Sequence, residues 1–448
     1  MIFPKYLLAV SVAALLSGCD MAPHYVRPAM PVPPALPGVS AAVEPADIAW
    51  RDFVTDDRLR RLIALALDQN RDLRVAVANV AQARAQYHVQ RAELAPRLGG
   101  SADATFQKLP AGTSAANTGS VAGAGRSDVY SVEAGIAAWE IDLFGRLRDL
   151  SRAAQERYLA SQDARDAVQV SLIAELASAY LTMAADQDRL RIARDTQAAF
   201  GQTLDLNKAR FRTGISSDLE VRQAQTSFDQ ARSDVAELTT LVAQDRNRID
   251  LLAGASVPVD LLPESLPADG SILAQLPQDL VSTVLLRRPD IAGAERELRA
   301  ANADIGAARA AFFPQISLTA MAGTLSLGLS NLFGGGSGTW TVAPSATLPI
   351  FDFGRTKGNL RYAEASRDAA LARYERSIQS GFREVADALA RRRTIDAQLE
   401  AQRSLREAAT VAYRLSDARF RKGVAPFLDT LDAQRTAYAA EKSLVATR

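Results

Sequence analysis

The stretch ARFRKGVAPFLDTLDAQ, residues 418–434, has an earlier counterpart in the same chain, ARFRTGISSDLEVRQAQ at residues 209–225. The glycine that follows the basic residues, Gly423, lies 209 positions after its counterpart Gly214 in a chain of 448 residues. Basic residues followed by glycine are typical of a helix end, because cations stabilise the negative end of the helix dipole and glycine adopts the left-handed C′ conformation. The sequence therefore predicts two equivalent helical hairpins, each with its tip at one of these glycines.

The repeat extends well beyond the two tips. The motif DLFGR at 142–146 returns as FDFGR at 351–355, again 209 positions later. Residues 72–96 return as residues 290–314, 218 positions later, and the difference is accounted for by the loop LPAGTSAANTGSVAGAGRS in the first copy. Internal similarity at a fixed offset indicates a duplicated structural unit.

Each half contains two stretches in which apolar and polar residues alternate, at about 96–108, 128–143, 314–325 and 339–350. In the second of these stretches the apolar face is expected to run in steps of two from Tyr130 to Ala138. Within each stretch the alternation itself covers about the 9 to 11 residues that a tilted membrane strand needs. Such alternation is found in transmembrane barrels and also in soluble antiparallel sheets with one buried face.

Four strands cannot form a membrane barrel alone, because about eight strands are the minimum and an open sheet edge cannot face lipid. If these strands lie in a membrane, several copies of the chain must share one barrel, and three copies would supply twelve strands. The remaining segments predict long helices. From Arg146 to Phe200 the chain has neither proline nor glycine, which allows a helix of roughly 80 Å at 1.5 Å per residue.

The composition argues against several functional classes. A net charge of +1 argues against a nucleic-acid partner. The two histidines, His24 and His88, and the single cysteine cannot build a metal cluster or a disulfide framework. No nucleophile, base and orienting group can be assembled from the sequence. We therefore expect no enzyme activity, no metal and no cofactor.

The N-terminus has the form of a bacterial lipoprotein signal. Lys5 precedes an apolar run that ends at Leu16, and Leu-Ser-Gly-Cys follows, with cleavage expected before Cys19. An ordinary secretory leader with a chance cysteine is the alternative. Cys19 would then carry a covalent lipid, followed by an extended arm with five prolines between Pro28 and Pro37. Asp20, directly after the lipidated cysteine, leaves lipoprotein sorting open, since aspartate there favours inner-membrane retention in enteric bacteria.

The predicted fold class is mainly α with a transmembrane β part, built from a duplicated unit of two strands and a long helical hairpin. The predicted segments are a signal peptide at 1–18, an anchor and arm at 19–54, a first repeat at 55–254, a linker at 255–275 and a second repeat at 276–448. The first repeat continues to Gly254, whose counterpart would lie about fifteen residues beyond Arg448. We therefore expect the last helix to be shortened in this sequence.

These features together resemble the TolC-like outer-membrane factors, in the lipoprotein branch that includes OprM and the NodT-type efflux subunits. The resemblance rests on the lipoprotein signal, the paired FGR motifs and ARFRKG followed by FLDTLDAQRTAY, and it covers residues 19–448. It implies a homotrimer whose 12-stranded barrel, surrounded by outer-membrane lipid, stands on a periplasmic α-helical barrel. It also implies a periplasmic adaptor protein and an inner-membrane pump of the RND type as partners.

The resemblance further implies a periplasmic gate at the second tip, formed by Leu428, Asp429 and Asp432. In a trimer these carboxylates would surround a narrow axis and attract cations. The alternative is that Asp429 caps a helix and that Asp432 is merely solvated. The first repeat has Glu220 and Gln223 at the positions of the two aspartates and so carries less charge.

By the same resemblance, the two hairpin tips would contact the adaptor. The tip residues are Gly214, Ile215, Ser216, Ser217, Gly423, Val424, Ala425 and Pro426. The expected function is a passive exit duct of a tripartite efflux system, lipid-anchored in the outer membrane and extending into the periplasm, that conducts small molecules such as drugs or toxic compounds. The alternatives are an outer-membrane channel for type I protein secretion and a structural or adaptor periplasmic lipoprotein.

Overall fold

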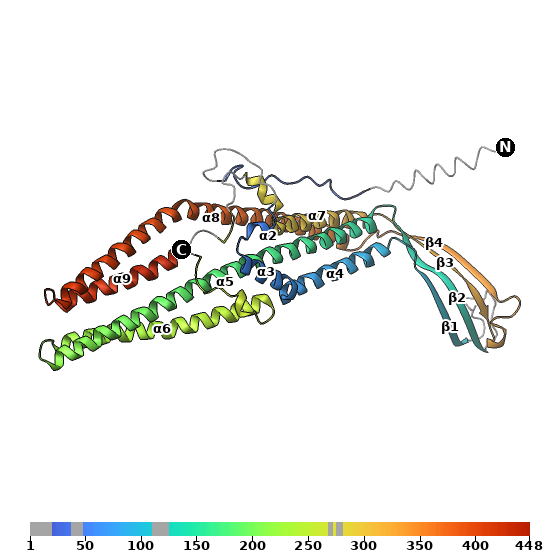
Figure 1. Cartoon of the computed structure of the whole chain (residues 1–448). Helices are drawn as coiled ribbons and strands as arrows, with labels where there is room; N and C mark the ends of the chain where they lie inside the picture. The colour runs from blue at the N-terminus through green and yellow to red at the C-terminus, as the bar shows by residue number, and fades with distance from the viewer. Residues whose placement is uncertain (1–19, 37–47, 110–124, 268–271, 275–280) are drawn as a thin grey trace. The chain divides into compact units, whose positions relative to one another are not determined.

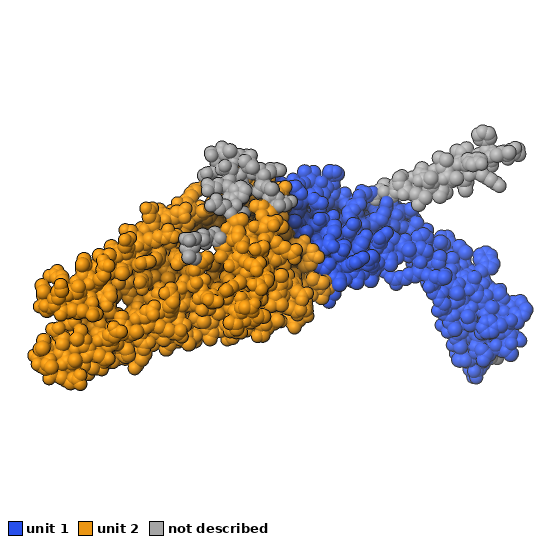
Figure 2. All heavy atoms as spheres, viewed as in Figure 1, with its two compact units in different colours: residues 1–29, 79–163, 290–377 blue, residues 30–78, 164–289, 378–448 orange. Residues whose placement is uncertain are grey.

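The computed structural model describes residues 20–36, 48–109, 125–267, 272–274 and 281–448. The chain divides into two compact units, which are coloured separately in Figure 2. Unit 1 comprises residues 1–29, 79–163 and 290–377, and unit 2 comprises residues 30–78, 164–289 and 378–448. Each unit takes segments from both copies of the repeat. The two repeats are therefore not separate compact units, because each copy contributes to both.

The described elements succeed one another along the chain as α2 (Trp50–Phe53), α3 (Asp57–Gln69), α4 (Arg71–Ala92), β1 (Leu98–Leu109), β2 (Gly125–Ile141), α5 (Arg146–Arg212), α6 (Asp218–Ala253), η1 (Val259–Leu261), η2 (Ser282–Arg287), α7 (Pro289–Ala310), β3 (Gln315–Ser326), η3 (Leu329–Asn331), β4 (Gly338–Thr347), α8 (Arg355–Arg421) and α9 (Phe427–Thr447). Helices α5 and α8 each have 67 residues, and each copy of the repeat supplies one of them (Figure 1). The four strands begin and end within three residues of the limits expected from the alternating pattern.

Unit 1 contains one antiparallel sheet with the strand order β1-β2-β3-β4. Each copy of the repeat supplies one strand pair, and β2 joins the two pairs by pairing with β3. Strands β1 and β4 are the edges of this sheet, and neither has a second partner strand among the described residues. The sheet is therefore open on both sides within a single chain.

The alternating face predicted for β2 is wrong at its end. The register of β2 against β3 shifts between Ile136 and Trp139, and Ala138 has a φ of 51°. The backbone N–H of Ala138 donates to the hydroxyl of Thr319 at 3.2 Å. A bulge adds one residue to the strand, so the residues on one face change from even to odd numbers and Ala138 does not continue the face of Tyr130.

Unit 2 contains the far ends of both helical hairpins (Figure 1). Helix α6 packs on α5 through an apolar cluster that includes Leu190, Ala193 and Leu238. Helix α9 packs on α8 through small residues, of which Ala409 and Ala440 are buried. Small side chains allow two helices to approach closely, so long alanine-rich helices can pair without large apolar residues.

The largest core among the described residues lies in unit 2, where α3 packs against α5 and α6. Asp56 caps α3 by accepting a 2.7 Å hydrogen bond from the N–H of Leu59, and such a cap contributes about 1 kcal/mol. Leu59 of α3, Leu176 of α5 and Ile249 of α6 are almost fully buried in this core. Each such side chain contributes about 1.5 to 3 kcal/mol by leaving water.

The segment predicted as a linker, 255–275, takes part in this core. Val257, Leu261, Leu262 and Ile272 are buried against the same cluster as α3. A run of buried aliphatic side chains fixes a connection to the core, whereas a free linker has few apolar contacts. The segment is therefore a structural part of unit 2 where it is described.

One described helix, α5, has an 18-residue window with a mean hydropathy of 1.4, so by length and composition it is apolar enough to cross a membrane. One third of this window is already buried inside the single chain. Buried core helices pass the same test, and Leu176 and Tyr180 of α5 lie in the core of unit 2.

Candidate functional site: the hairpin tips

The two hairpin tips have the same backbone geometry. Gly214 has a φ of 74° and Gly423 a φ of 72°. At the first tip the N–H of Ile215 donates to the carbonyl of Arg210 at 2.9 Å, and at the second tip Val424 donates to Arg419 at 2.9 Å. These bonds satisfy carbonyl groups at the helix ends that would otherwise lack partners. The structure thus places both glycines in the left-handed conformation expected from the sequence.

The helices that return from the two tips begin differently. Ser217 caps α6, and its side chain and that of Glu220 form a reciprocal capping box. Pro426 occupies the cap position of α9 without a side-chain hydrogen bond, and Asp429 lies in the first turn. Glu220, which corresponds to Asp429, is therefore committed to a local structural role. Because proline fixes the backbone φ angle, α9 starts from a rigid residue and not from a side chain that caps the helix by a hydrogen bond.

Each tip exposes two aliphatic side chains on corresponding positions. Ile215 and Leu219 are 67% and 66% exposed at the first tip, and Val424 and Leu428 are 67% and 50% exposed at the second. Exposed aliphatic residues that gather at one place are typical of an interaction site. Leu219 was not among the residues that the sequence singled out, although its position relative to Gly214 repeats that of Leu428 relative to Gly423.

The residues proposed for the gate all lie in the first two turns of α9. Leu428, Asp429 and Asp432 are exposed in the single chain. Leu428 and Asp432 are four residues apart and so lie on the same face of the helix. The structure thus brings these three side chains together on one short segment.

An aromatic core joins the two tips behind these exposed residues. Phe420 of α8 and Phe427 of α9 are buried, with ring centroids 5.5 Å apart. Leu204 of α5 and Ala224 of α6 belong to the same cluster. The guanidinium of Arg210 lies 4.9 Å from the ring of Phe420, a cation–π distance. The tip of the first hairpin therefore packs against the tip of the second.

A polar link connects α6 and α9 further from the tips. Asp234 of α6 accepts hydrogen bonds from the hydroxyl of Tyr438 at 2.7 Å and from the ammonium of Lys442 at 3.0 Å. The guanidinium of Arg435 donates to the hydroxyl of Ser227 at 2.9 Å and 3.1 Å. These hydrogen bonds link α6 of the first hairpin to α9 of the second.

The protonation of Asp234 is set by this link. Burial raises the pKa of Asp234, but the hydrogen bonds from Tyr438, Gln230 and Lys442 outweigh burial and leave the pKa below its ordinary value. Burial and the neighbouring carboxylate raise the pKa of Tyr438. The pair is therefore a carboxylate facing a neutral phenol at neutral pH.

Sequence reasoning missed this link. Arg435, Tyr438 and Lys442 follow one another at spacings of three and four on α9, which is a signal of one polar helix face. Their partners Ser227 and Asp234 lie more than 200 residues earlier, separated from them by 208 and 204 positions. No local pattern identifies partners at that distance.

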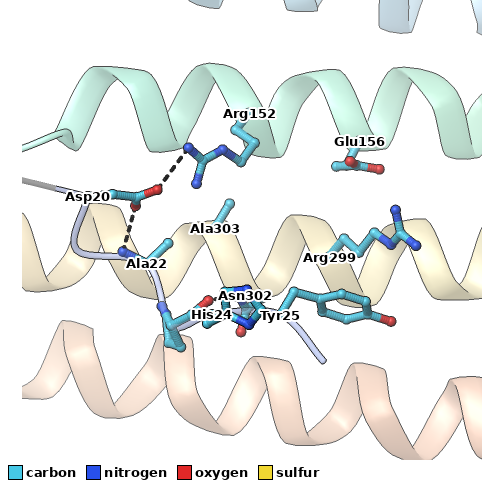
Figure 3. Close-up of a pocket in the computed structure, with 10 residues that line it drawn as sticks. Asp20, Ala22, His24, Tyr25, Arg152, Glu156, Arg299, Asn302 and Ala303 are labelled. Carbon is cyan, nitrogen blue, oxygen red and sulfur yellow. Dashed lines mark hydrogen bonds and ion pairs between the residues drawn. The ribbon is translucent and has the colours of Figure 1, made fainter. Parts of the chain in front are cut away.

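The expected lipidation residue, Cys19, lies outside the described residues, but the residues after it are described in unit 1. Figure 3 shows Asp20, Ala22, His24 and Tyr25 beside α5 and α7, where they line a pocket of about 450 Å³. The carboxylate of Asp20 pairs with Arg152 of α5 at 3.0 Å, and Asn302 of α7 donates to the carbonyl of Pro23 at 2.6 Å. The chain after Cys19 is thus docked on the helices of unit 1.

A buried carboxyl group lies beneath this segment. The side chain of Asp149 is 1% exposed, and Arg152 contacts one of its oxygens at 3.1 Å. Burial, and then the charge of Asp20, raise the pKa of Asp149 to about 7. Gly306 of α7 makes room for it, since a Cβ at Gly306 would lie 2.1 Å from an oxygen of Asp149.

The described residues contain no group of three or more histidine, cysteine, aspartate or glutamate side chains that could hold a metal ion. What the geometry does contain is an open four-stranded sheet in one unit and two linked helical hairpins in the other. A class of protein that combines these two features is the outer-membrane channel with long periplasmic helices.

The chain belongs to the outer membrane efflux protein family, whose pattern it matches over residues 62–255 and 280–448. It is 43% identical over 452 residues to the toluene efflux pump outer membrane protein TtgC of Pseudomonas putida, which covers 99% of this chain and 92% of TtgC. The antibiotic efflux pump outer membrane protein ArpC of Pseudomonas putida has the same identity and coverage. The outer membrane protein OprJ of Pseudomonas aeruginosa is 40% identical, over 98% of this chain and 91% of OprJ.

Solved structures show the same fold. The open state of the MtrE outer membrane channel of Neisseria gonorrhoeae superposes with a TM-score of 0.84 at 36% identity, covering 96% of this chain and 94% of MtrE. A membrane protein from Pseudomonas aeruginosa superposes with a TM-score of 0.88 at 39% identity, with the same coverage. The predicted fold class, a duplicated strand-and-hairpin unit of the trimeric efflux-channel type, is confirmed.

The predicted function is confirmed as well. The chain is the outer-membrane exit duct of a tripartite efflux system, and it is a channel protein and not an enzyme. Its location is the outer membrane. The relatives are named as efflux pump outer membrane proteins, which agrees with the efflux duct that the sequence favoured over its alternatives.

Proposed function

We propose that this duct conducts small toxic molecules, such as antibiotics and aromatic solvents, which a pump in the inner membrane delivers. The names of two relatives with 43% identity, one for toluene and one for antibiotic efflux, support this substrate class. The duct itself performs no chemical step. Selectivity then resides in the pump, since a duct that only guides molecules outward needs no specific contacts with them.

The tips of the two hairpins receive the periplasmic adaptor in this proposal, and an RND-type pump supplies the energy. The exposed pairs Ile215 with Leu219 and Val424 with Leu428 support an apolar contact, because these side chains lie at the ends of the hairpins and face water in the single chain. The glycines hold the two tips in one shape, so that an adaptor can bind both in the same way.

The second tip acts as the gate. The observation that carries this proposal is the position of Leu428, Asp429 and Asp432 on the first two turns of α9, the helix that Asp234 of α6 holds through Tyr438. In the trimer, three copies of each carboxylate surround the axis, where they attract cations and narrow the passage together with the leucines. Release of the link between α6 and α9 lets the second hairpin move outward.

A lipid on Cys19 anchors the chain in addition to its barrel. Support comes from the lipoprotein signal and from the docked segment that follows, in which Asp20 pairs with Arg152. Labelling cells with a palmitate analogue tests this directly. The wild-type chain should incorporate the label, and Cys19→Ala should not. Label in the variant would mean that the lipid is attached to another residue, and an unlabelled wild type would contradict the lipid anchor.

The gate is tested by single-channel conductance of the detergent-purified protein in a planar bilayer. We expect small, cation-preferring steps from the wild type and larger, less selective steps from Asp429→Ala combined with Asp432→Ala. The matched control is Asp218→Ala, which removes an exposed carboxylate in the first turn of α6 and should leave conductance unchanged. Raising the salt concentration should weaken the cation preference, because exposed charges are screened. Equal conductance in the double variant and the wild type would show that these aspartates do not form the gate.

A further inference from the structure

The first two turns of α5 carry three basic residues, and each of them is paired with a carboxylate in unit 1. The pairs are Arg146 with Glu140 at 2.9 Å, Arg148 with Asp142 at 3.2 Å, and Arg152 with Asp149 at 3.1 Å and with Asp20 at 3.0 Å. The charges of the first repeat are therefore compensated at the place where β2 continues into the long helix.

The second repeat keeps these cations and loses the carboxylates. At the offset of 209 that relates the two FGR motifs, the basic residues return on α8 as Arg355, Lys357 and Arg361. The three carboxylates that belong to the repeat itself return as Pro349, Phe351 and Gly358. The fourth carboxylate, Asp20, belongs to the N-terminal arm and has no counterpart in the second repeat. The second repeat has thus retained the charge without its compensation.

The three cations of α8 are uncovered in the single chain. All three residues are exposed, and none of their side chains forms a hydrogen bond or an ion pair with another described residue. Asp352 attracts Arg355, but its oxygens accept hydrogen bonds from the backbone N–H groups of Gly354 at 3.0 Å and Thr356 at 2.8 Å. The first turn of α8 contains no acidic residue, and cations near the start of a helix oppose its dipole. Nothing in the described chain explains why this cluster is positively charged.

Exposed aromatic residues adjoin the cations. Phe351 and Phe353 are 78% and 92% exposed, and their ring centroids lie 4.6 Å apart. Phe144, the counterpart of Phe353, stacks on Phe313 at 4.8 Å, whereas the counterpart of Phe313 is Ala95 and offers no ring. Phe353 also has a φ of 53°, which is uncommon for a residue other than glycine. The backbone therefore presents this ring without a packing partner from the repeat.

The aromatic residues continue the apolar face of β4. Apolar side chains recur in steps of two along this strand and the residues after it, and those most exposed are Trp340 at 77%, Val342 at 58%, Leu348 at 49% and Ile350 at 93%. The outward face of an outer-membrane strand meets lipid. Where such a face ends, aromatic rings favour the membrane interface, and long cationic side chains reach the headgroups. The exposed rings and cations therefore lie at the border between the membrane and the periplasm.

We propose that Arg355, Lys357 and Arg361 bind the phosphate groups of acidic phospholipids at the periplasmic face of the outer membrane, while Phe351 and Phe353 enter the boundary between headgroups and acyl chains. Lys357 and Arg361 are four residues apart and share one face of α8. Arg355 begins the helix, so the three cations span about 9 Å along its axis. This lipid contact belongs to the second repeat alone, because the carboxylates of the first repeat already occupy its basic groups.

Native mass spectrometry of the detergent-purified protein, titrated with phosphatidylglycerol or with phosphatidylethanolamine, measures this contact. The wild type should bind the acidic lipid more tightly than the zwitterionic one. Each cation beside an acidic lipid surface contributes about five-fold to affinity. Arg355→Gln, Lys357→Gln and Arg361→Gln combined should therefore weaken phosphatidylglycerol binding by at least about ten-fold. Arg355→Lys with Arg361→Lys keeps the charge and should keep the preference for the acidic lipid.

The matched control removes the same charge at the hairpin tips. It combines Lys208→Gln, Arg212→Gln and Lys422→Gln, which change three exposed residues of unit 2, and it should bind lipid as the wild type does. An equal loss in both triple variants would reduce the effect to net charge and overturn the proposal. Loss of trimers in the α8 variant with unchanged lipid binding would mean that these cations contact another copy of the chain, which contradicts the lipid partner.

Free phosphate is the other source of the same chemistry. Inorganic phosphate at millimolar concentration should leave bound phosphatidylglycerol in place, because the acyl chains and the two rings add to the contact. Displacement of the lipid by inorganic phosphate would mean that the cations hold a soluble anion and not a lipid headgroup. Single-channel conductance of the α8 variant should equal that of the wild type, since the cations face lipid. A conducting wild type that binds both lipids equally would overturn this inference and leave the duct intact.

The depth of the aromatic residues is measured by tryptophan fluorescence in lipid nanodiscs. The native tryptophans, Trp50, Trp139 and Trp340, are first replaced by phenylalanine. In this background, emission from Phe353→Trp should be quenched by brominated phospholipid and protected from iodide. Phe211→Trp is the matched control, because Phe211 is 46% exposed at the first tip and should be quenched by iodide alone. Emission from Phe353→Trp that only iodide quenches would place the ring in water and contradict its entry into lipid.

Discussion

The hydroxyl of Tyr438 on α9 donates a hydrogen bond of 2.7 Å to Asp234 on α6, joining the two hairpins of one chain. The Asp234 side chain is 11% exposed, and its carboxylate also accepts a hydrogen bond from Lys442. A hydrogen bond to a buried charged group is strong, and it is costly to leave such a group unpaired. This contact therefore holds the hairpin that carries Leu428, Asp429 and Asp432 against its neighbour.

Tyr438→Phe should loosen the gate. The variant keeps the ring but removes the hydroxyl, so the coupling between the hairpins should fall by about 1.5 to 3 kcal/mol. Single-channel recordings should show larger or more frequent openings than in the wild type. Tyr413→Phe is the control, because the Tyr413 hydroxyl accepts from Gln434 between α8 and α9 of the same hairpin. An equal rise in both variants would show that the contact with Asp234 is not special.

Acid should weaken the same link. Hydrogen bonds outweigh burial and hold the pKa of Asp234 below its ordinary value, so its stabilising contribution is present above about pH 4 and is lost as pH falls through the lower, folded-state pKa. Openings should therefore become more frequent in strong acid. Asp234→Asn should open more often at neutral pH and lose this part of the acid response. A response of the same size in Asp234→Asn would assign it to other groups.

Asp149 should make the folding stability depend on pH with the opposite sign to Asp234. Its nearest charged groups are Asp20, Arg152, Asp142 and Arg148. Burial raises its pKa to about 7, so the folded state binds a proton that the unfolded state has released. Its contribution to stability is therefore complete below about pH 4 and is lost as pH rises to about 7.

Asp149→Asn should remove this decline, because the amide is neutral at every pH. Thermal unfolding in detergent at pH 5 and pH 8 measures the effect. The wild type should lose more stability than the variant between the two pH values. Asp218→Asn, which changes an exposed aspartate, should behave like the wild type. A wild type that is equally stable at both pH values would show that Asp149 is charged at both.

Gly423→Ala should destabilise the second tip without a steric clash. A Cβ there would meet no atom within 4 Å, but the backbone φ is 72°. The left-handed conformation costs an ordinary residue about 1 to 2 kcal/mol, so the tip should exchange its amide hydrogens faster. Lys422→Ala changes the preceding residue and should leave exchange unaltered. Unaltered exchange in Gly423→Ala would mean that the tip relaxes to a different turn.

Several elements could be predicted from the sequence because they depend on neighbouring residues. The tip glycines, the basic helix ends before them and the alternating strands are local patterns, and the structure contains a turn or a strand at each. The repeat also predicted equivalent strand pairs. The bulge at Ala138 was not predictable, because the register shift depends on how β2 meets β3, a strand from the other repeat.

The contacts between distant segments came from the structure alone. Asp234 and Tyr438 are separated by 204 positions and carry no shared motif. The raised pKa of Asp149 depends on burial beneath residues that directly follow Cys19, which composition cannot show. The segment at 255–275 was predicted as a linker between the two repeats, yet several of its aliphatic residues are buried in the core of unit 2.

By itself, the sequence determined the duplicated unit, the long helices, the four strands and the family resemblance, since periodicity and helix-end signals act over a few residues. Only the tertiary structure decided which hairpin residues hold one another, where a carboxyl group is desolvated and which strand edges remain open. Those properties depend on segments that come together only on folding, because hydrogen bonding, burial and charge interaction act through space and not along the chain.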